Sequence, residues 1–217
     1  MDNNIERVGQ KYDKELDWLC PDPLVYNLWE SHASYHIIQK YRTILNWRVA
    51  DFGCNNAIQC CMLSNSPSVD SVIGFDISEN ALNDARRNIR NHAKCRPEKI
   101  EFWQCNLVNN DYPDCDIDAG ICLHTLEHIY PEDLDAVVSG MRRIMRPGAR
   151  LVFSVPCRDA FSQATRHVSQ FSIQPEDGYI SLVRLFKDNG FSVRDIYEDD
   201  LIAGDNTLCI TGVACTP

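Results

Sequence analysis

Short apolar runs alternate with segments of helical periodicity through the middle of the chain. The runs, each of a length typical of a buried strand, span residues 48–53, 71–76, 99–105, 116–123 and 150–155. The segments with apolar residues at helical spacing span residues 57–63, 79–93 and 131–145. This alternation predicts a mostly parallel sheet with helices on both faces, and right-handed crossovers then give a doubly wound α/β fold. Pro147 and Gly148 are expected to end the last of these helices.

The C-terminal part of the chain departs from this alternation of strands and helices. A helix is expected over residues 177–189, with Gly190 as its end, followed by strands over 191–197 and 207–215. No helical pattern lies between the two strands, so they are expected to pair in antiparallel fashion. The fold class is therefore Rossmann-like, with a seven-stranded sheet of five parallel strands and a C-terminal antiparallel hairpin. A dehydrogenase domain has six parallel strands instead.

The N-terminal part precedes this alternating core and is expected to be helical. One helix is predicted to end at the prolines 21 and 23, and a second is predicted over residues 24–45. Two interpretations stay open for these helices, because they would either cap a pocket or pack against the sheet. A single domain is expected over residues 1–217, with a helical cap at 1–45 and the core at 46–217.

Composition is ordinary for a soluble globular protein, but the charge is unbalanced. Of 217 residues, 44% are hydrophobic and 24% are charged, and the net charge is −10. Because an acidic surface repels phosphate backbones, no nucleic-acid partner is expected. Basic residues do gather on one predicted helix, where they form either a solvated face or a polyanion site: Arg86, Arg87, Arg90, Lys94 and Arg96.

Neither export nor membrane insertion is expected. The first residues have no apolar segment of signal-peptide length, and no apolar run approaches the roughly 18 residues needed to span a bilayer. A cytoplasmic location follows, and there the eleven cysteines would serve as small buried hydrophobes. No C-x-x-C pair occurs and Cys60 and Cys61 are adjacent, so no metal site is expected.

Two strand ends carry the most informative chemistry. The first apolar run ends in Asp51 and Gly53, and the second ends in Asp76. A strand, a tight glycine turn, a helix and a second strand that ends in an acid form a nucleotide-binding βαβ unit. The glycine allows close approach of the backbone, and the acid accepts hydrogen bonds from ribose hydroxyls. The pattern therefore indicates an adenosine-containing cofactor, and a nicotinamide oxidoreductase remains an alternative that the antiparallel tail disfavours.

From Trp47 to Ala214 the chain resembles the class I S-adenosylmethionine-dependent methyltransferases. Five motifs of that family occur in order, at residues 49–55, 74–78, 104–107, 122–129 and 145–156. The small-molecule O-methyltransferases, such as the ubiquinone-pathway enzymes, are the most similar subgroup by these motifs. Asn55 and Ala57 depart from the pattern, since they stand where the family has its second and third glycines.

The resemblance implies S-adenosylmethionine as the cofactor and a role for each strand end. Backbone at Gly53, Cys54 and Asn55 would face the methionine part, and Asp51 would interact with its ammonium group. The other implied contacts are Asp76 with the ribose hydroxyls, Ile77 with the adenine, Asn106 and Leu107 at the border of the base, and Leu123 near the sulfonium.

Histidines after the fourth and fifth strands are the candidates for proton transfer. His128 is the first candidate for a general base, with His124 and His167 as alternatives, and a structural role for His128 at the start of a helix stays open. The spacing from His124 to His128 also matches an H-x-x-E-H zinc motif, but the segment follows a strand and Pro131 begins the next helix.

The resemblance implies methyl transfer to a small-molecule acceptor, with a hydroxyl as the expected group. Motifs of nucleic-acid base methylation are missing at the positions where they would stand. The alternative is a degenerate member that keeps the fold and has a binding or regulatory role without turnover, which the substitutions Asn55 and Ala57 motivate. The sequence leaves the acceptor and the oligomeric state open.

Overall fold

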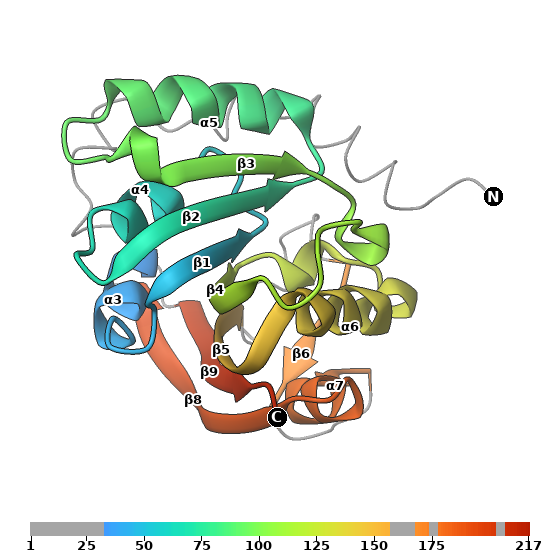
Figure 1. Ribbon diagram of the computed structural model, residues 1–217. Coiled ribbons are helices and arrows are strands. Elements are labelled where there is room, and N and C mark those ends of the chain that lie inside the picture. The colour runs from blue at the N-terminus through green and yellow to red at the C-terminus, as the bar shows by residue number, and fades with distance from the viewer. Residues whose placement is uncertain (1–32, 157–167, 174–177, 203–206) are drawn as a thin grey trace. The chain divides into compact units, whose positions relative to one another are not determined.

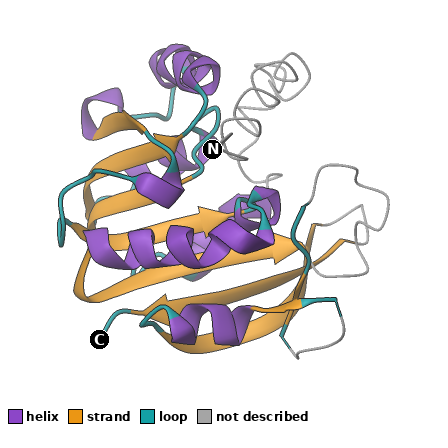
Figure 2. Cartoon of the chain, turned by 90° about the vertical axis from the view of Figure 1, so that its right-hand side faces the viewer, coloured by secondary structure: helices purple, strands orange, loops and turns teal. Residues whose placement is uncertain are grey.

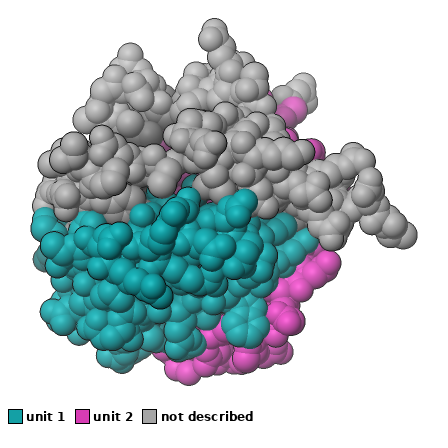
Figure 3. Space-filling model, turned by 90° about the horizontal axis from the view of Figure 1, so that it is seen from above, with its two compact units in different colours: residues 1–106 teal, residues 107–217 magenta. Residues whose placement is uncertain are grey.

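Figure 1 shows the computed structural model, which describes residues 33–156, 168–173, 178–202 and 207–217. The chain divides into two compact units, residues 1–106 (unit 1) and 107–217 (unit 2), which Figure 3 colours separately. Most of the predicted N-terminal cap lies outside the described residues. Its described part contains helix α3 (Ala33–Lys40), which falls within the second predicted helix.

Unit 1 contains three parallel strands: β1 (Trp47–Phe52), β2 (Val69–Asp76) and β3 (Ile100–Gln104). β2 is the middle strand, with β1 and β3 on its two sides. Because β1 and β2 pair in parallel register, Phe52 lies opposite Phe75, and their rings stack with centroids 5.4 Å apart. The strands predicted at 48–53, 71–76 and 99–105 are confirmed, and β1 and β2 lie side by side as the nucleotide-binding interpretation requires.

Two helices complete the βαβ connections of unit 1: α4 (Ile58–Ser64) and α5 (Glu79–Asn91). Ser78 begins α5 as an N-cap, because its Oγ accepts a 3.0 Å hydrogen bond from the backbone N–H of Ala81. α5 runs along β2 and β3 (Figure 1) and turns one apolar face inward, with its buried residues Ala81, Leu82, Ala85 and Ile89. Both helices were expected at these positions.

Unit 2 holds four long strands: β4 (Ile117–Leu123), β5 (Met145–Pro156), β8 (Ser192–Ile202) and β9 (Thr207–Cys215). β4 pairs with β5 in parallel, whereas β9 is antiparallel to both β5 and β8. Helices α6 (Leu134–Ile144) and α7 (Leu182–Asp188) contact each other and lie in front of these strands in Figure 2. The ring of Phe153 in β5 stacks on the ring of Phe186 in α7, with centroids 4.4 Å apart.

The sheet has seven strands in the order β3-β2-β1-β4-β5-β9-β8. Mostly parallel strands with a C-terminal antiparallel hairpin are the arrangement that the sequence predicts, so the Rossmann-like α/β class is confirmed. None of the described helices combines the length and the apolar character that a bilayer crossing requires.

Two boundaries in unit 2 differ from expectation. Helix α6 ends at Ile144, so Pro147 and Gly148 do not end it but lie inside β5, where the register with β4 shifts. A bulge accommodates both residues, because proline has no N–H for the ladder and Gly148 adopts φ +80°. Helix α7 begins only at Leu182, since β7 (Ile180–Ser181) first pairs with β6 (Phe171–Ser172).

Candidate active site

Two backbone hydrogen bonds join the turn after β1 to the end of β2. The backbone N–H groups of Gly53 and Cys54 both donate to the carbonyl oxygen of Phe75, at 2.8 and 2.9 Å. Gly53, Asn55 and Ala57 have φ values of +81°, +44° and +67°. These are left-handed conformations that glycine adopts without strain, so Asn55 and Ala57 hold the backbone shape in which the family has glycine.

Asp76 joins the two strand ends through its carboxylate. Its Oδ2 accepts a hydrogen bond from the backbone N–H of Asn55 at 2.8 Å, and its Oδ1 accepts one from the backbone N–H of Ser78 at 2.9 Å. The side chain is only half-buried. Since each carboxylate oxygen has two lone pairs, Asp76 retains acceptor capacity for hydroxyl groups of a ligand.

Asp51 is a buried acid at the end of β1, with 2% of its surface exposed. The Sγ of Cys60 donates to its Oδ2 at 3.2 Å. Burial raises the pKa of Asp51 to about 7, with a smaller opposing effect from Cys60 and a small further increase from the charge of Asp76. Asp51 therefore titrates near neutral pH, where a nearby cation would favour its ionised form.

The side chain of Asn55 provides a test of whether a cofactor fits. Its Oδ1 is buried and has no hydrogen-bond partner among the described residues. An amide oxygen that is buried without a hydrogen-bond donor destabilises the fold, so this atom is suited to accept from a ligand donor such as an ammonium group. The first two strand ends thus offer acceptors of the kind that the amino group and the ribose of S-adenosylmethionine require.

Gly74 allows β2 to approach the turn closely. A Cβ atom at this position would lie 2.8 Å from Sγ of Cys54 and 2.9 Å from Cδ1 of Phe102. The residue after β3 is hydrogen-bonded to the end of β2, because the N–H of Cys105 donates to the carbonyl oxygen of Asp76 at 2.9 Å. Asn106 follows directly on that strand end and is half-buried. Parallel strand ends thus bring Asp51, Gly53 to Asn55, Asp76, Ile77 and Asn106 to one edge of unit 1.

The two remaining predicted cofactor residues belong to unit 2, and both are buried. Leu107 begins the short helix η4 (Leu107–Asn109) with 8% of its surface exposed. Leu123 is the last residue of β4 and is 4% exposed. Its carbonyl accepts from Oγ1 of Thr125 at 3.4 Å.

A histidine and a buried glutamate lie together just after β4. His124 has a left-handed φ of +55°, and its N–H donates to the carbonyl oxygen of Ser154 at 2.9 Å. Its Nδ1 is 3.7 Å from Oε1 of Glu127, which is 1% exposed. Burial raises the pKa of Glu127 to about 8.

Glu127 also positions the chain that follows β5. Its backbone carbonyl accepts hydrogen bonds from the N–H groups of Val168 and Ser169, at 2.9 and 3.2 Å. Its Oε2 is buried without a hydrogen-bond partner in the described part of the chain. A buried carboxyl of raised pKa with an unused oxygen is typical of functional sites.

His128 is the last residue of the 3₁₀-helix η5 (Leu126–His128) and is half-buried. His124 precedes this helix and the helix is a single short turn, so the two histidines do not share the α-helical face that a zinc protease needs. Within the described residues, no group of three or more His, Cys, Asp or Glu side chains is placed to hold a metal ion. His167, the third candidate, lies outside the described residues.

Sequence reasoning did not assign roles to Cys60 or Glu127. Cys60 lies nine positions after Asp51, and only the fold of α4 brings its thiol to that carboxylate. Glu127 lies in the motif at 122–129, and the sequence offered the H-x-x-E-H spacing as a signal. Burial raises the pKa of Glu127, and that burial depends on tertiary packing, which local sequence patterns do not reveal.

The chain is similar to known methyltransferases. A family model described as "Methyltransferase domain" matches residues 50–153. "O-methyltransferase resE" of Aspergillus sclerotiorum is 22% identical over 149 residues, which are 67% of this chain and 54% of that protein. "Probable methyltransferase ltbC" of Aspergillus luteorubrus is 31% identical over 107 residues, or 48% of this chain and 38% of that protein. The chain therefore spans about half the length or less of these two relatives.

Solved structures show the same fold. The N-methyltransferase NodS from Bradyrhizobium japonicum, in complex with S-adenosyl-L-homocysteine, superposes with a TM-score of 0.69 at 14% identity and covers 97% of this chain and 98% of its own. The [4+2]-cyclase SpnF gives a TM-score of 0.72 at 13% identity, with 97% and 95% covered. Residues 50–153 thus match a methyltransferase family, and the chain shares the fold of S-adenosylmethionine-dependent methyltransferases of known structure.

Proposed function

We propose that the protein transfers the methyl group of S-adenosylmethionine to a small-molecule acceptor, with a hydroxyl oxygen as the nucleophile. The observation that carries the proposal is the carboxylate of Asp76, held by Asn55 and Ser78 at the paired ends of β1 and β2. The relatives described as O-methyltransferases support oxygen as the accepting atom.

The cofactor supplies a methyl group that its sulfonium already activates, so the protein needs mainly to bind, orient and exclude water. Asp76 would accept from the ribose hydroxyls, and Asp51 and Oδ1 of Asn55 would accept from the ammonium group. The remaining assignments follow the family resemblance: backbone of Gly53 and Cys54 at the methionine part, Ile77 on the adenine, Asn106 and Leu107 at the border of the base, and Leu123 near the sulfonium.

A hydroxyl nucleophile must lose a proton, and a neutral imidazole accepts one near pH 7. His128 remains the first candidate, with His124 and His167 as alternatives. The position of Glu127 supports His124: its pKa of about 8 leaves the carboxyl mostly protonated near pH 7, and an imidazolium forming 3.7 Å away at Nδ1 would favour the ionised carboxylate, which in turn stabilises that cation. In this arrangement Glu127 positions and stabilises His124 rather than reacting itself.

Location, partners and domain organisation are proposed on the same basis. The net charge of −10 supports a small-molecule acceptor over nucleic acid, and we place the protein in the cytoplasm. Residues 1–217 are proposed to act as a single methyltransferase domain.

A panel of acceptors tests the proposed reaction. The full chain is incubated with S-adenosylmethionine and separate sets of phenols and alcohols, amines, and oligonucleotides, and S-adenosylhomocysteine is quantified. We expect its formation with the hydroxyl compounds, and loss of formation in Asp76→Ala. Formation with amines or oligonucleotides alone would contradict the proposed acceptor while leaving methyl transfer intact.

A binding protein without turnover is the second candidate, and Ala57 favours it. Ala57 is fully buried at φ +67°, where an L-residue costs roughly 1–2 kcal/mol relative to glycine. If the turn cannot relax around the cofactor, binding would persist in weakened form and transfer would fail. Saturable binding of S-adenosylhomocysteine without product from any acceptor set would favour this candidate.

A further inference from the structure

Unit 1 contains a concave site at the ends of β1 and β2 opposite to the proposed cofactor residues. A pocket of about 720 Å³ lies where α3, the turn that precedes β1, the end of α4 and the turn that precedes β2 come together. Its volume is in the range of small-molecule sites. β1 is six residues long, or roughly 20 Å at about 3.3 Å per residue, so a ligand here would not overlap the cofactor residues.

Hydrogen bonds between the segments around this pocket hold its walls in place without a ligand. The N–H of Trp47 donates to the carbonyl of Ser68 at 2.8 Å, which joins the turns that precede β1 and β2. Ser66 and Ser68 join their hydroxyls at 3.0 Å, and Nζ of Lys99 donates to the carbonyl of Ser66 at 3.4 Å. Nε2 of Gln59 donates to Oγ of Ser34 at 3.1 Å, which fastens α3 to α4. A preformed pocket loses little conformational entropy when a ligand binds.

The lining combines an apolar floor with positive charge. Ile38, Leu45 and Met62 form part of the floor and are 5%, 1% and 6% exposed. Arg42 and Lys94 are its charged residues, and both are exposed to solvent. Among the described residues that line the pocket none is acidic, although the whole chain has 31 acidic residues against 21 basic ones. Positive charge without acids, in an acidic protein, favours an anionic ligand.

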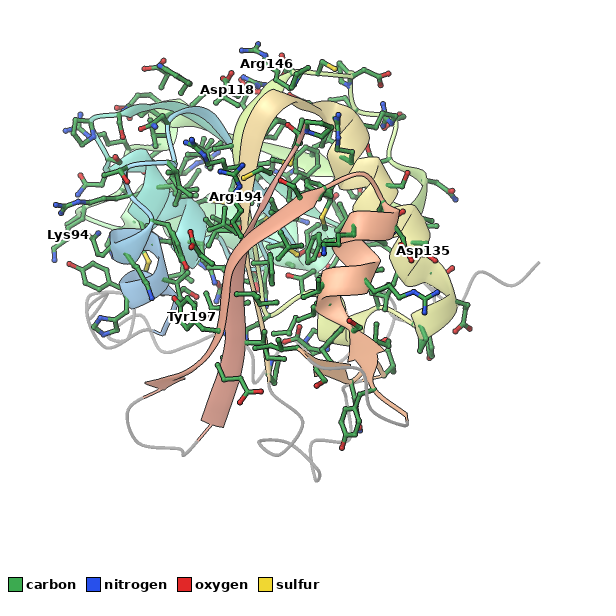
Figure 4. All side chains as sticks on the ribbon, turned by 90° about the horizontal axis from the view of Figure 1, so that it is seen from below. Lys94, Asp118, Asp135, Arg146, Arg194 and Tyr197 are labelled. Carbon is green, nitrogen blue, oxygen red and sulfur yellow. The ribbon has the colours of Figure 1, made fainter. Side chains whose placement is uncertain are left out.

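The basic residues that the sequence groups on one helix divide in the structure, because α5 ends at Asn91 and Lys94 lies beyond it. Arg86 pairs with Glu79 at 3.1 Å and lies over the ring of Phe102, and Arg87 pairs with Asp84. Those two arginines therefore belong to a solvated helix face. Lys94 follows the helix and lies at the edge of unit 1 beside α3 in Figure 4, where it lines the pocket.

We propose that this pocket binds a small organic anion, independently of the methyl-transfer reaction. Its carboxylate or phosphate would pair with the guanidinium of Arg42 and the ammonium of Lys94, because charge-assisted hydrogen bonds to such groups are the strong ones. Its apolar part would pack on the floor at Ile38, Leu45 and Met62.

Calorimetric titration of the full chain with octyl phosphate and with octanoate tests this site and distinguishes phosphate from carboxylate. We expect one of them to bind with 1:1 stoichiometry and inorganic phosphate to bind at least about tenfold more weakly, since it has no apolar part to bury. Binding is expected to be unchanged when S-adenosylhomocysteine is present at saturating concentration. Competition between the two would place the anion at the cofactor residues and overturn the proposal.

Variants identify the residues that hold the anion. Arg42→Gln and Lys94→Gln are each expected to weaken binding roughly fivefold or more. Asn65→Trp, at the exposed rim, should abolish binding by filling the pocket. Arg90→Gln removes one exposed positive charge of unit 1 that does not line the pocket and should change affinity less than about twofold.

Thermal midpoints measured by circular dichroism confirm that each variant is folded. The proposal is overturned if neither octyl phosphate nor octanoate binds at millimolar concentration. It is equally overturned if folded Arg42→Gln and Lys94→Gln bind the anion as well as Arg90→Gln does. Neither result depends on methyl transfer, so failure of this site and failure of the proposed reaction are distinguishable.

Discussion

The backbone N–H of Asn55 donates a 2.8 Å hydrogen bond to the carboxylate of Asp76. The residue that replaces a glycine of the first motif is thereby held by the acid of the second motif. This contact links the conformation of the turn after β1 to the group proposed to bind ribose. A change at either residue should therefore affect both cofactor affinity and the stability of the turn.

Replacement of Asp76 by alanine should weaken binding of S-adenosylhomocysteine by roughly 2–4 kcal/mol, because paired charge-assisted hydrogen bonds to the ribose are lost. Isothermal titration calorimetry measures the change. Asp70→Ala is the control, since Asp70 is exposed near the other end of the same strand. Equal affinity in the two variants would show that the ribose does not bind at Asp76.

The raised pKa of Asp51 predicts a dependence of stability on pH. The pKa of its carboxyl rises from 3.8 to about 7 on folding, so the folded state binds more protons between those values. The free energy of unfolding should therefore fall as pH rises from about 4 to 7, by up to about 1.4 kcal/mol per pH unit from this group. Asp51→Asn should remove this contribution, and urea unfolding at a series of pH values measures it. A difference between wild type and Asp51→Asn that stays constant across this range would contradict the prediction.

Gly74→Ala should destabilise the protein by about 1–3 kcal/mol, because the added Cβ would lie 2.8 Å from Sγ of Cys54. Urea unfolding of the single variants and of the double variant Cys54→Ala/Gly74→Ala separates the causes. The double variant should recover part of the loss, and Phe102, 2.9 Å from the same Cβ, accounts for the part that remains. Strict additivity would mean that Cys54 is not the residue that excludes a side chain at Gly74.

A histidine that takes the proton of the acceptor should affect turnover far more than cofactor binding. His128→Asn is expected to lower kcat by roughly 10²–10⁴-fold and to leave the affinity for S-adenosylhomocysteine within about twofold of wild type. His124→Asn tests the alternative that Glu127 supports, and exposed His36→Asn is the control. Parallel losses of turnover and cofactor affinity in His128→Asn would assign it a structural role.

The strand ends of unit 1 were predictable because their signals are local. Continuous apolar runs that end in Asp51 and Asp76 specify two buried strands, and a parallel α/β sheet brings such ends to one edge. The start of α7 was less predictable, because the pairing of β6 with β7 joins segments that no local pattern connects. In the sequence, Pro147 and Gly148 are as compatible with a helix end as with a β-bulge. Only the register shift between β4 and β5 in the structure identifies a bulge.

The raised pKa values of Asp51 and Glu127 could not be predicted from sequence. Asp51 and Glu127 are ordinary carboxylates until the fold removes them from water, and burial alone supplies the largest part of each raised pKa. The thiol of Cys60 reaches Asp51 across nine positions through the turn and the first residues of α4. Such contacts depend on tertiary packing, which spacing and composition do not encode.

A crystal structure of the complex with S-adenosylhomocysteine tests the central claim most directly. The account predicts both ribose hydroxyl oxygens within about 3.2 Å of the Asp76 carboxylate and the amino group near Asp51 and Oδ1 of Asn55. A ribose bound away from Asp76, or these strand ends filled by the protein's own side chains, would contradict it.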